Sequence, residues 1–235
     1  MIQPALYLLP TTIGESDIDR AIPRANRDVM AQIKHFIVEN VRTARRYLKR
    51  VDKDIDIDTL TFSELNKHTA PEDIAAYLAP LRRGEAVGVI SEAGCPAIAD
   101  PGADVVAIAQ REGMRVIPLV GPSSIVMSLM ASGFNGQSFA FNGYLPVERN
   151  ERARAIRRCE RNVYDEDQTQ IFIETPYRNN RIVDDLIALC RPSTRLCIAA
   201  DITGEGEYIK TKTLRQWKAE RRELDKVPCI FLIYK

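Results

Sequence analysis

Two short apolar runs in the first half of the chain are each followed at once by a loop of small residues. The first run, residues 86–90 (AVGVI), precedes residues 91–102 (SEAGCPAIADPG), and the second, residues 116–120 (VIPLV), precedes residues 121–124 (GPSS). Apolar runs of this length are typical of strands buried on both faces. A helical pattern over residues 103–112 separates them. The order strand, helix, strand predicts a mostly parallel sheet that is covered on both faces.

Both loops consist largely of Gly, Pro, Ser and Ala, which let a ligand approach the backbone N–H and C=O groups closely. In an open parallel sheet, ligands bind just beyond the carboxyl ends of the strands. Either loop alone is more simply explained as a tight turn, because isolated small-residue motifs are weak signals. Two such loops at the ends of neighbouring strands favour a ligand site.

The rest of the chain extends this α/β pattern. In the first half we expect strands over 5–9 and 59–62, an apolar run at 33–38, and helices over 41–51, 71–83 and 123–131. In the second half we expect helices over 149–162 and 179–190, strands over 170–173, 196–200 and 229–234, and a β-hairpin around Gly204 and Gly206. These elements predict two α/β domains, residues 1–120 with a parallel sheet and residues 121–235 with a mixed sheet.

The composition excludes several classes of function. The formal net charge is only +1, so a contact with nucleic acid or an anionic membrane would require a local patch. No apolar run approaches the roughly 18 to 20 residues of a membrane span, and no basic segment precedes an apolar one at the N-terminus. The five cysteines lack zinc-site spacing and only two histidines are present. We therefore expect no metal site and a cytoplasmic location.

Five motifs follow one another along nearly the whole chain. They are residues 6–14 (LYLLPTTIG), the loops 91–102 and 121–124, residues 141–146 (FNGYLP) and residues 174–178 (ETPYR). In this order they resemble the tetrapyrrole methylase superfamily of S-adenosylmethionine-dependent methyltransferases. Within it, they are most similar to the branch of bacterial ribosomal RNA small-subunit methyltransferases I, which methylate a cytidine 2′-hydroxyl. The resemblance implies two α/β domains with the cofactor in the cleft between them, and a homodimer.

The resemblance also implies which residues hold S-adenosylmethionine. They are Pro10, Thr12, Glu92, Ala93, Cys95, Ser123, Ser124 and Ile125, and, from the second domain, Ile173, Glu174, Ala200 and Pro228. Glu92 stands where the branch usually has Asp. Strand termination explains Pro10 and Pro228 equally well, and the core of a helix explains Ile125 equally well. Asp100 is more readily a helix cap than a catalytic group.

The residues expected to contact the methyl acceptor differ more from the branch than the cofactor loops do. The branch has the tract Glu-Asp-Thr-Arg-x-Thr where this chain has residues 39–44 (ENVRTA). One carboxylate and two hydroxyls of that tract are therefore absent here. Glu39 and Arg42 remain, and they are the candidate catalytic residues. A later Arg-Glu-Leu-Thr-Lys of the branch is residues 200–204 (ADITG), without either basic group. The cofactor loops are thus better retained than the acceptor residues, which predicts a divergent paralogue.

Two basic stretches are candidates for RNA phosphate contacts. The first, Arg42, Arg45, Arg46 and Lys49, occupies one face of a helix and favours function. The second, Arg149, Arg152, Arg154, Arg157, Arg158 and Arg161, is mixed with Glu148, Glu151 and Glu160, which favours a solvated face with i,i+4 ion pairs. Tyr144 and Tyr177 are candidates for stacking on unpaired bases, although aromatic residues beside Gly and Pro commonly pack.

Three functions stay open on the sequence alone. The leading hypothesis is an S-adenosylmethionine-dependent methyltransferase that 2′-O-methylates a ribose in ribosomal or other structured RNA. The second keeps the cofactor and takes a small-molecule acceptor such as a tetrapyrrole, which the near-neutral charge favours. The third is a catalytically inactive module that binds S-adenosylmethionine or a nucleotide, which the absent carboxylate and hydroxyls favour.

Overall fold

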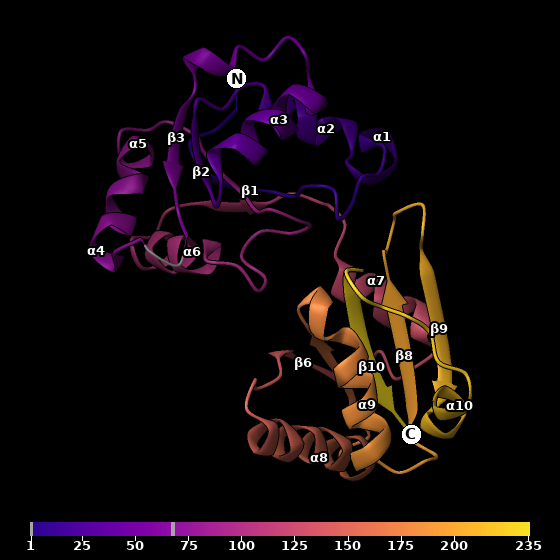
Figure 1. The fold of residues 1–235 in the computed structure, drawn as a ribbon. Helices are drawn as coiled ribbons and strands as arrows, with labels where there is room; N and C mark the ends of the chain where they lie inside the picture. Colours follow the sequence, from indigo (N-terminus) through magenta and orange to yellow (C-terminus); the bar gives the residue numbers. More distant parts are fainter. Residues whose placement is uncertain (1, 67–68) are drawn as a thin grey trace. The chain divides into compact units, whose positions relative to one another are not determined.

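The structure is a computed structural model that describes residues 2–66 and 69–235, in two units, Met1–Ser123 and Ser124–Lys235 (Figure 1). The first unit is built on a five-stranded sheet whose neighbouring strands all run parallel. Its strands are β1 (Leu6–Leu9), β2 (His35–Val38), β3 (Thr61–Glu64), β4 (Val87–Ile90) and β5 (Val116–Pro118). Their order across the sheet is β3-β2-β4-β1-β5. The predicted parallel sheet is therefore confirmed.

This strand order creates a switch point between β1 and β4. The connection that leaves β1 leads to β2 on one side, whereas the connection that leaves β4 leads to β5 on the other. Loops that depart in opposite directions leave a crevice beyond the carboxyl ends of the two strands. The topology thus places the loops after β1 and β4 where an open parallel sheet binds its ligand.

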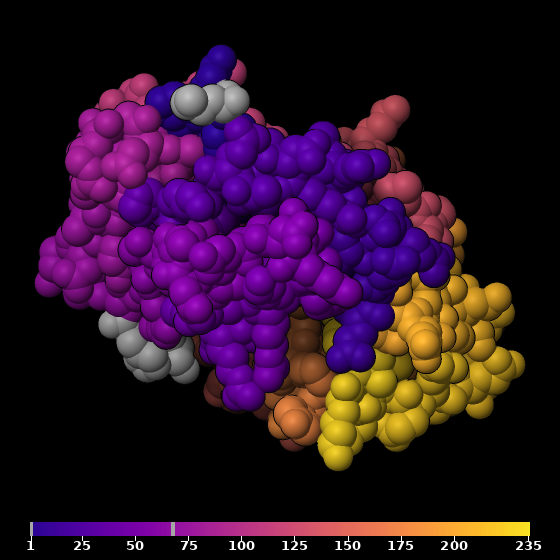
Figure 2. All heavy atoms as spheres, turned by 90° about the horizontal axis from the view of Figure 1, so that it is seen from above, coloured from indigo at the N-terminus to yellow at the C-terminus, as the bar shows by residue number. Residues whose placement is uncertain are grey.

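Helices cover both faces of this sheet because successive strand side chains alternate between the faces. Tyr7 and Leu9 of β1 pack with the helices of one side, and Leu6 packs with those of the other. The first side holds α1 (Ile18–Ala21), α2 (Arg24–Met30), α3 (Val41–Val51) and the 3-10 turn η1 (Ile57–Thr59). The second holds α4 (Pro71–Ile74), η2 (Ala75–Leu78), α5 (Ala79–Arg82) and α6 (Gly102–Arg111). Figure 2 shows the indigo and violet residues of the first side from outside.

The expectation of a single helix over 71–83 is wrong, because the segment is broken into α4, η2 and α5. Leu78 has φ −88° and ψ 2°, outside the helical range, directly before α5. Pro80 lies at the start of α5, where a missing N–H is tolerated, whereas the interior of a longer helix would not tolerate it. Gly84, with φ +84°, ends the segment as expected.

The second unit contains a mixed sheet in the order β6-β7-β10-β8-β9. Its strands are β6 (Phe139–Tyr144), β7 (Thr169–Ile173), β8 (Arg195–Ala200), β9 (Tyr208–Thr213) and β10 (Cys229–Tyr234). Only β6 and β7 pair in parallel, and the expected hairpin is the antiparallel pair of β8 and β9. The sequence did not indicate β6, because Asn142 and Gly143 interrupt its apolar pattern and Gly143 has φ +64°.

One helix lies on one face of this second sheet and three lie on the other. The first is α7 (Ser124–Ser132), and the three are α8 (Arg149–Asp165), α9 (Asn179–Leu189) and α10 (Leu214–Ala219). The 3-10 turn η3 (Pro176–Arg178) leads into α9. In the part of the chain that the structure describes, no helix combines the length and apolar character needed to cross a membrane.

Candidate active site

Three loops at the carboxyl edge of the first sheet are joined by backbone contacts. The Thr11 N–H donates to the Gly94 carbonyl at 2.9 Å, which ties the loop after β1 to the loop after β4. The loop after β5 touches the first loop, because a Cβ added at Gly121 would lie 2.2 Å from Pro10 Cβ. Glycine is required where the main chain passes this close to the Pro10 ring. The three loops therefore form one assembled surface.

Cys95 joins the second of these loops to the third. Its thiol donates to the carbonyls of Gly121 and Pro122, with Sγ–O distances of 3.7 and 3.3 Å. Burial raises the pKa of this thiol above its ordinary value, so it stays neutral near pH 7. Cys95 thus positions loops, a role that its place among the expected cofactor residues did not reveal.

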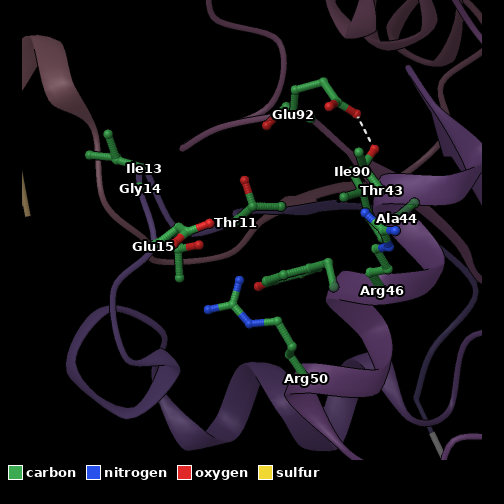
Figure 3. A pocket seen from close by; sticks show the side chains of 13 residues that line it. Thr11, Ile13, Gly14, Glu15, Thr43, Ala44, Arg46, Arg50, Ile90 and Glu92 are labelled. Atoms are coloured by element: carbon green, nitrogen blue, oxygen red, sulfur yellow. Dashed lines mark hydrogen bonds between the residues drawn. The ribbon is translucent and has the colours of Figure 1, made fainter. Parts of the chain in front are cut away.

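A cavity of about 430 Å³ opens beside these loops (Figure 3). Residues 11–15 of the first loop, residues 90–92 of the second and one side of α3 line it. Tyr47 of α3 holds the first loop in place, since its hydroxyl donates to the Pro10 carbonyl at 2.8 Å. Burial raises the pKa of the Tyr47 phenol, so this donor is retained at any physiological pH. The expected Thr12 and Glu92 both line the cavity.

Thr11 is the most informative residue of this cavity. Only 4% of it is exposed, and its Oγ1 has no hydrogen-bond partner among the described residues. A buried hydroxyl without a partner costs free energy. Among the described residues, seven buried side-chain polar atoms lack a partner, and of these only Thr11 Oγ1 belongs to a residue that lines the cavity. In Figure 3 the Thr11 side chain lies between Glu92 on one side and the guanidinium of Arg50 on the other. A ligand group with hydrogen-bonding capacity would satisfy it.

Of the four basic residues expected on one face of α3, Arg46 lines the cavity, and Arg50, which was not among the four, lines it as well. Arg45 forms an ion pair with Asp58 at 2.8 Å, and Lys49 donates to the Lys53 carbonyl at 2.8 Å. Arg46 and Arg50, one helical turn apart, line the cavity instead. Arg50 donates to the Ser16 carbonyl at 2.9 Å, and neither guanidinium forms an ion pair within the described residues. The cavity therefore presents two guanidinium groups, together with the carboxylates of Glu15 and Glu92, to a ligand.

The candidate catalytic residue Glu39 follows β2 and lies beside the second loop. Its Oε1 accepts a hydrogen bond from the Glu92 N–H at 3.2 Å. Burial raises the pKa of the Glu39 carboxyl, the hydrogen bond lowers it, and the carboxylates of Asp100 and Glu92 raise it further. Raised carboxyl pKa values are typical of groups that exchange protons in an active site. The Glu92 carboxylate itself accepts from the Thr43 hydroxyl, as Figure 3 shows.

Asp100 has a structural role in the same loop. Its carboxylate accepts from the N–H groups of Ala97 and Gly102, at 2.9 and 2.7 Å, and Gly102 is the first residue of α6. Ala97 and Ala99 have φ of 66° and 61°, a conformation that alanine rarely adopts. The carboxylate therefore stabilises a strained turn and the helix start, as the capping interpretation predicted.

Arg42 and Asn40 lie at the start of α3. The Asn40 side chain accepts from the N–H groups of Arg42 and Thr43, at 2.9 and 3.2 Å, and thereby caps the helix. Asn thus replaces the Asp of the branch without loss of the cap. The Arg42 side chain is exposed, forms no ion pair within the described residues, and does not line the cavity.

The residues expected from the second unit gather at one edge of its sheet. Ile173 ends β7, Ala200 ends β8, and Pro228 immediately precedes β10, which is antiparallel to both strands. Glu174 is buried, and its carboxylate accepts from the Thr175 N–H at 2.7 Å and from Arg178 at 2.6 Å. Its negative charge is therefore already paired inside the unit.

Ser123, Ser124 and Ile125 lie where the two units join in sequence. Ser123 ends the first unit, and Ser124 begins both the second unit and α7. Ile125 is partly buried and packs against the core beneath α7. Among the described residues, no group of three or more His, Cys, Asp or Glu side chains is placed to bind a metal ion.

Comparison with known proteins gives one consistent family. Residues 22–218 match the family model of the tetrapyrrole (corrin/porphyrin) methylases. The chain is 30% identical to a Vibrio cholerae protein named ribosomal RNA small subunit methyltransferase I, over 98% of this chain and 77% of that protein. It is 33% identical to the Mesorhizobium japonicum protein of the same name, over 91% of this chain and 69% of that protein.

Two solved structures share the fold. The crystal structure of the methyltransferase CobJ aligns with a TM-score of 0.66 at 14% identity, over 98% of this chain and 94% of that one. Uroporphyrin-III-C-methyltransferase from Thermus thermophilus aligns with a TM-score of 0.57 at 18% identity, over 98% of this chain and 92% of that one. The expected two-sheet α/β fold is confirmed by these neighbours.

Proposed function

This chain belongs to the tetrapyrrole methylase family of S-adenosylmethionine-dependent methyltransferases, and from that premise we propose that it methylates a ribose 2′-hydroxyl in small-subunit ribosomal RNA. The names of the relatives support ribosomal RNA as the acceptor. The observation that carries the proposal is the cavity at the β1/β4 switch point, where a buried hydroxyl without a partner lies beside two arginines that form no ion pair in the described chain.

The loops fit S-adenosylmethionine chemically. Glu92 and Ala93 are exposed residues of the second loop, and the Glu92 carboxylate can accept hydrogen bonds from hydroxyl or ammonium groups. A Cβ at Gly94 would lie 3.1 Å from the Pro122 carbonyl, so the second and third loops can approach each other only with glycine there. The cofactor supplies a methyl group activated on a sulfonium. We propose that Pro10, Thr12, Glu92, Ala93, Cys95, Ser123, Ser124 and Ile125 form its binding surface.

Arg46 and Arg50 suit the acceptor, because guanidinium groups bind phosphate through paired N–H donors. We propose that they hold a phosphate next to the reacting ribose in the 430 Å³ cavity. Holding the acceptor oxygen in line with the methyl group at about 3 Å contributes several kcal/mol to catalysis. The Thr11 hydroxyl would then donate to the bound nucleotide, which gives this buried group its partner.

Glu39 is the proposed acceptor of the proton released from the ribose hydroxyl. Burial raises the pKa of the Glu39 carboxyl, which makes its carboxylate a stronger base. The hydrogen bond from the Glu92 N–H fixes its orientation. Arg42, exposed at the start of α3, is proposed to contact the RNA next to this group.

The remaining parts of the proposal rest on the resemblance. Ile173, Glu174, Ala200 and Pro228 are proposed to close over the adenosine part of the cofactor. The homodimer and the cytoplasmic location are also carried over from the family and stay predictions. Sedimentation of the purified protein tests the dimer.

Cofactor binding is tested by calorimetry and thermal unfolding with S-adenosylmethionine and S-adenosylhomocysteine. At a hundredfold excess over Kd, a ligand specific for the folded state adds about 2.7 kcal/mol, which raises Tm by roughly 5 to 10 °C in a chain of this size. Ala93→Tyr should abolish the shift, whereas Ala31→Tyr, at another exposed alanine outside the three loops, should preserve it. Absence of any shift in the wild type would refute the cofactor site.

A further inference from the structure

The outer face of α8 carries a groove that the proposed reaction does not use. Arg154, Arg157, Arg158 and Arg161 are all exposed and follow the spacing i, i+3, i+4, i+7, so they lie on one helix face. With Pro146, Glu151 and Ala155 they line a hollow of about 620 Å³, which we term the α8 groove. At 1.5 Å per residue, the four arginines extend along about 10 Å of helix.

The positive charge of the α8 groove is largely uncompensated. Within the described residues, its arginines form a single ion pair, Arg154 with Glu151 at a distance of 4.0 Å. Two other carboxylates of this helix have contacts outside the groove: Glu148 caps the helix, and Glu160 accepts from the Arg191 N–H and the Thr194 hydroxyl, both at 2.6 Å. The sequence favoured a face of i,i+4 ion pairs here, and the structure does not bear this out.

One arginine of the same helix differs from these four and holds the groove in shape. Arg152 is only 1% exposed and pairs with Asp185 at 2.7 Å. Its guanidinium also donates to the carbonyls of Pro146 and Val147, at 3.3 and 2.6 Å. Because Pro146 lines the groove, this buried arginine fixes the rim to the helix. The groove is therefore a preformed surface, which lowers the entropic cost of binding.

Two exposed aromatic rings lie at the edge of the second sheet at which α8 begins. Tyr144 is 61% exposed and precedes Pro146 by two residues, and Tyr177 is 76% exposed in η3. They follow from β6 and β7, which are parallel neighbours, so both rings lie at the edge from which the chain enters α8. Neither ring packs into the core. Neither ring lines the α8 groove itself. Exposed aromatic rings together with guanidinium groups on one domain are typical of proteins that bind single-stranded RNA.

We propose that the α8 groove binds the phosphodiester backbone of the RNA acceptor, at a position outside the cofactor loops. Guanidinium groups pair with successive phosphates, and Tyr144 and Tyr177 stack on unpaired bases next to them. This inference rests on the proposed function, since it assigns a second contact to the same RNA. It also explains how a chain of net charge +1 recognises a polyanion, because the basic residues are concentrated on one helix face.

The test measures binding of a fluorescein-labelled, single-stranded 20-nucleotide RNA of mixed sequence by anisotropy at several salt concentrations. Each phosphate contact to a single strand contributes about 0.7 to the slope of log K against log salt. Arg157→Gln combined with Arg161→Gln should therefore lower the slope by about 1.4. Between about 50 and 200 mM salt, the wild type should lose roughly sevenfold more affinity than this variant.

The matched control removes two exposed arginines elsewhere, Arg24→Gln on α2 with Arg149→Gln outside the groove. It should keep the wild-type slope, and both variants should bind S-adenosylmethionine normally. If the groove variant and the wild type had equal slopes of log K against log salt, the assignment of RNA binding to the α8 groove would be overturned, and the proposed function would stay intact. Failure of the wild type to bind or methylate RNA would instead overturn the proposed function. If the groove variant lost binding to phosphatidylserine vesicles as strongly as it lost binding to RNA, the assignment of the groove to RNA would be overturned.

Discussion

Replacement of Thr11 by valine should stabilise the protein while impairing the reaction. The Thr11 side chain is 4% exposed, and its hydroxyl has no partner among the described residues. A buried polar group without a hydrogen bond costs about 1 to 3 kcal/mol, and valine has the same shape with a methyl group in place of the hydroxyl. We expect the free energy of unfolding to rise by about 1 kcal/mol without ligands.

The same substitution at Thr169 provides the control. Thr169 is fully buried, and its hydroxyl donates to the Asn135 carbonyl at 2.9 Å. Thr169→Val breaks a hydrogen bond that is already made, so it should lower the free energy of unfolding by about 1 to 2 kcal/mol. The two variants differ only in whether the buried hydroxyl has a protein partner, and urea denaturation measures both.

The catalytic consequence of Thr11→Val is opposite in sign to its effect on stability. Loss of a hydrogen bond to the bound nucleotide, worth about 1.4 kcal/mol, lowers kcat/KM for methyl transfer about tenfold. Thr169→Val should leave kcat/KM unchanged once the protein is folded. If Thr11→Val destabilises the protein as Thr169→Val does, or retains full activity, the assignment of the Thr11 hydroxyl to the ligand is incorrect.

Three further predictions concern the loops, the cap and the carboxylates. Gly121→Ala should lower the free energy of unfolding by about 1 to 3 kcal/mol, because the new Cβ would overlap Pro10, whereas Gly136→Ala, with open space around it, should change it little in urea denaturation. Asn40→Ala should cost about 0.5 to 2 kcal/mol in the same assay through loss of the α3 cap, and Asn40→Asp, which keeps an accepting oxygen, should cost only a few tenths. Burial raises the pKa of Glu39, so the wild type loses stability as pH rises through its ordinary and raised pKa values. Glu39→Gln should therefore gain in stability relative to the wild type as pH rises above the ordinary carboxyl pKa, as measured by urea denaturation, while losing methyl transfer. A difference in stability that does not depend on pH would contradict the raised pKa.

The sequence predicted the first sheet and its loops well because their signals are local. Continuous apolar runs such as residues 86–90 identify buried strands, and Gly84, which has φ +84°, marks the end of the helical segment before β4. The broken segment at 71–82 was missed because its helical periodicity continues through Pro80, whose effect depends on where the backbone turns. β6 was missed because Gly143 interrupts its pattern and is accommodated only by pairing with β7.

The active-site prediction was limited by contacts between distant segments. The pattern at 42–49 correctly indicated a basic helix face, but only the folded chain shows that Arg46 and Arg50 line the cavity while Arg45 pairs with Asp58. The sequence contained no sign of the role of Thr11 beyond its place in the first motif. Whether a hydroxyl has a hydrogen-bond partner depends on residues that are distant in the sequence. A turn-by-turn inspection of α3 for cations four residues apart would have suggested Arg46 and Arg50.

Charge mixing on α8 misled the sequence interpretation in a similar way. Interleaved Arg and Glu residues predict mutual ion pairs, but the pairs form only if neither partner has a better contact elsewhere. Glu160 accepts hydrogen bonds from the Arg191 N–H and the Thr194 hydroxyl, and Arg152 forms an ion pair with Asp185. Arg157, Arg158 and Arg161, which form no ion pair within the described residues, are thereby left for an external anion.

The most direct test of the proposed function is methyl transfer to small ribosomal subunits from cells that lack this protein. The subunits are incubated with S-adenosylmethionine labelled in its methyl group, and the RNA is then hydrolysed in alkali, which cannot cleave beside a 2′-O-methylated ribose. We predict label in a single alkali-resistant dinucleotide, and none with the combined variant Arg46→Gln and Arg50→Gln. Unlabelled RNA from wild-type protein that binds S-adenosylmethionine normally would contradict the proposal and leave a small-molecule acceptor or an inactive binding module.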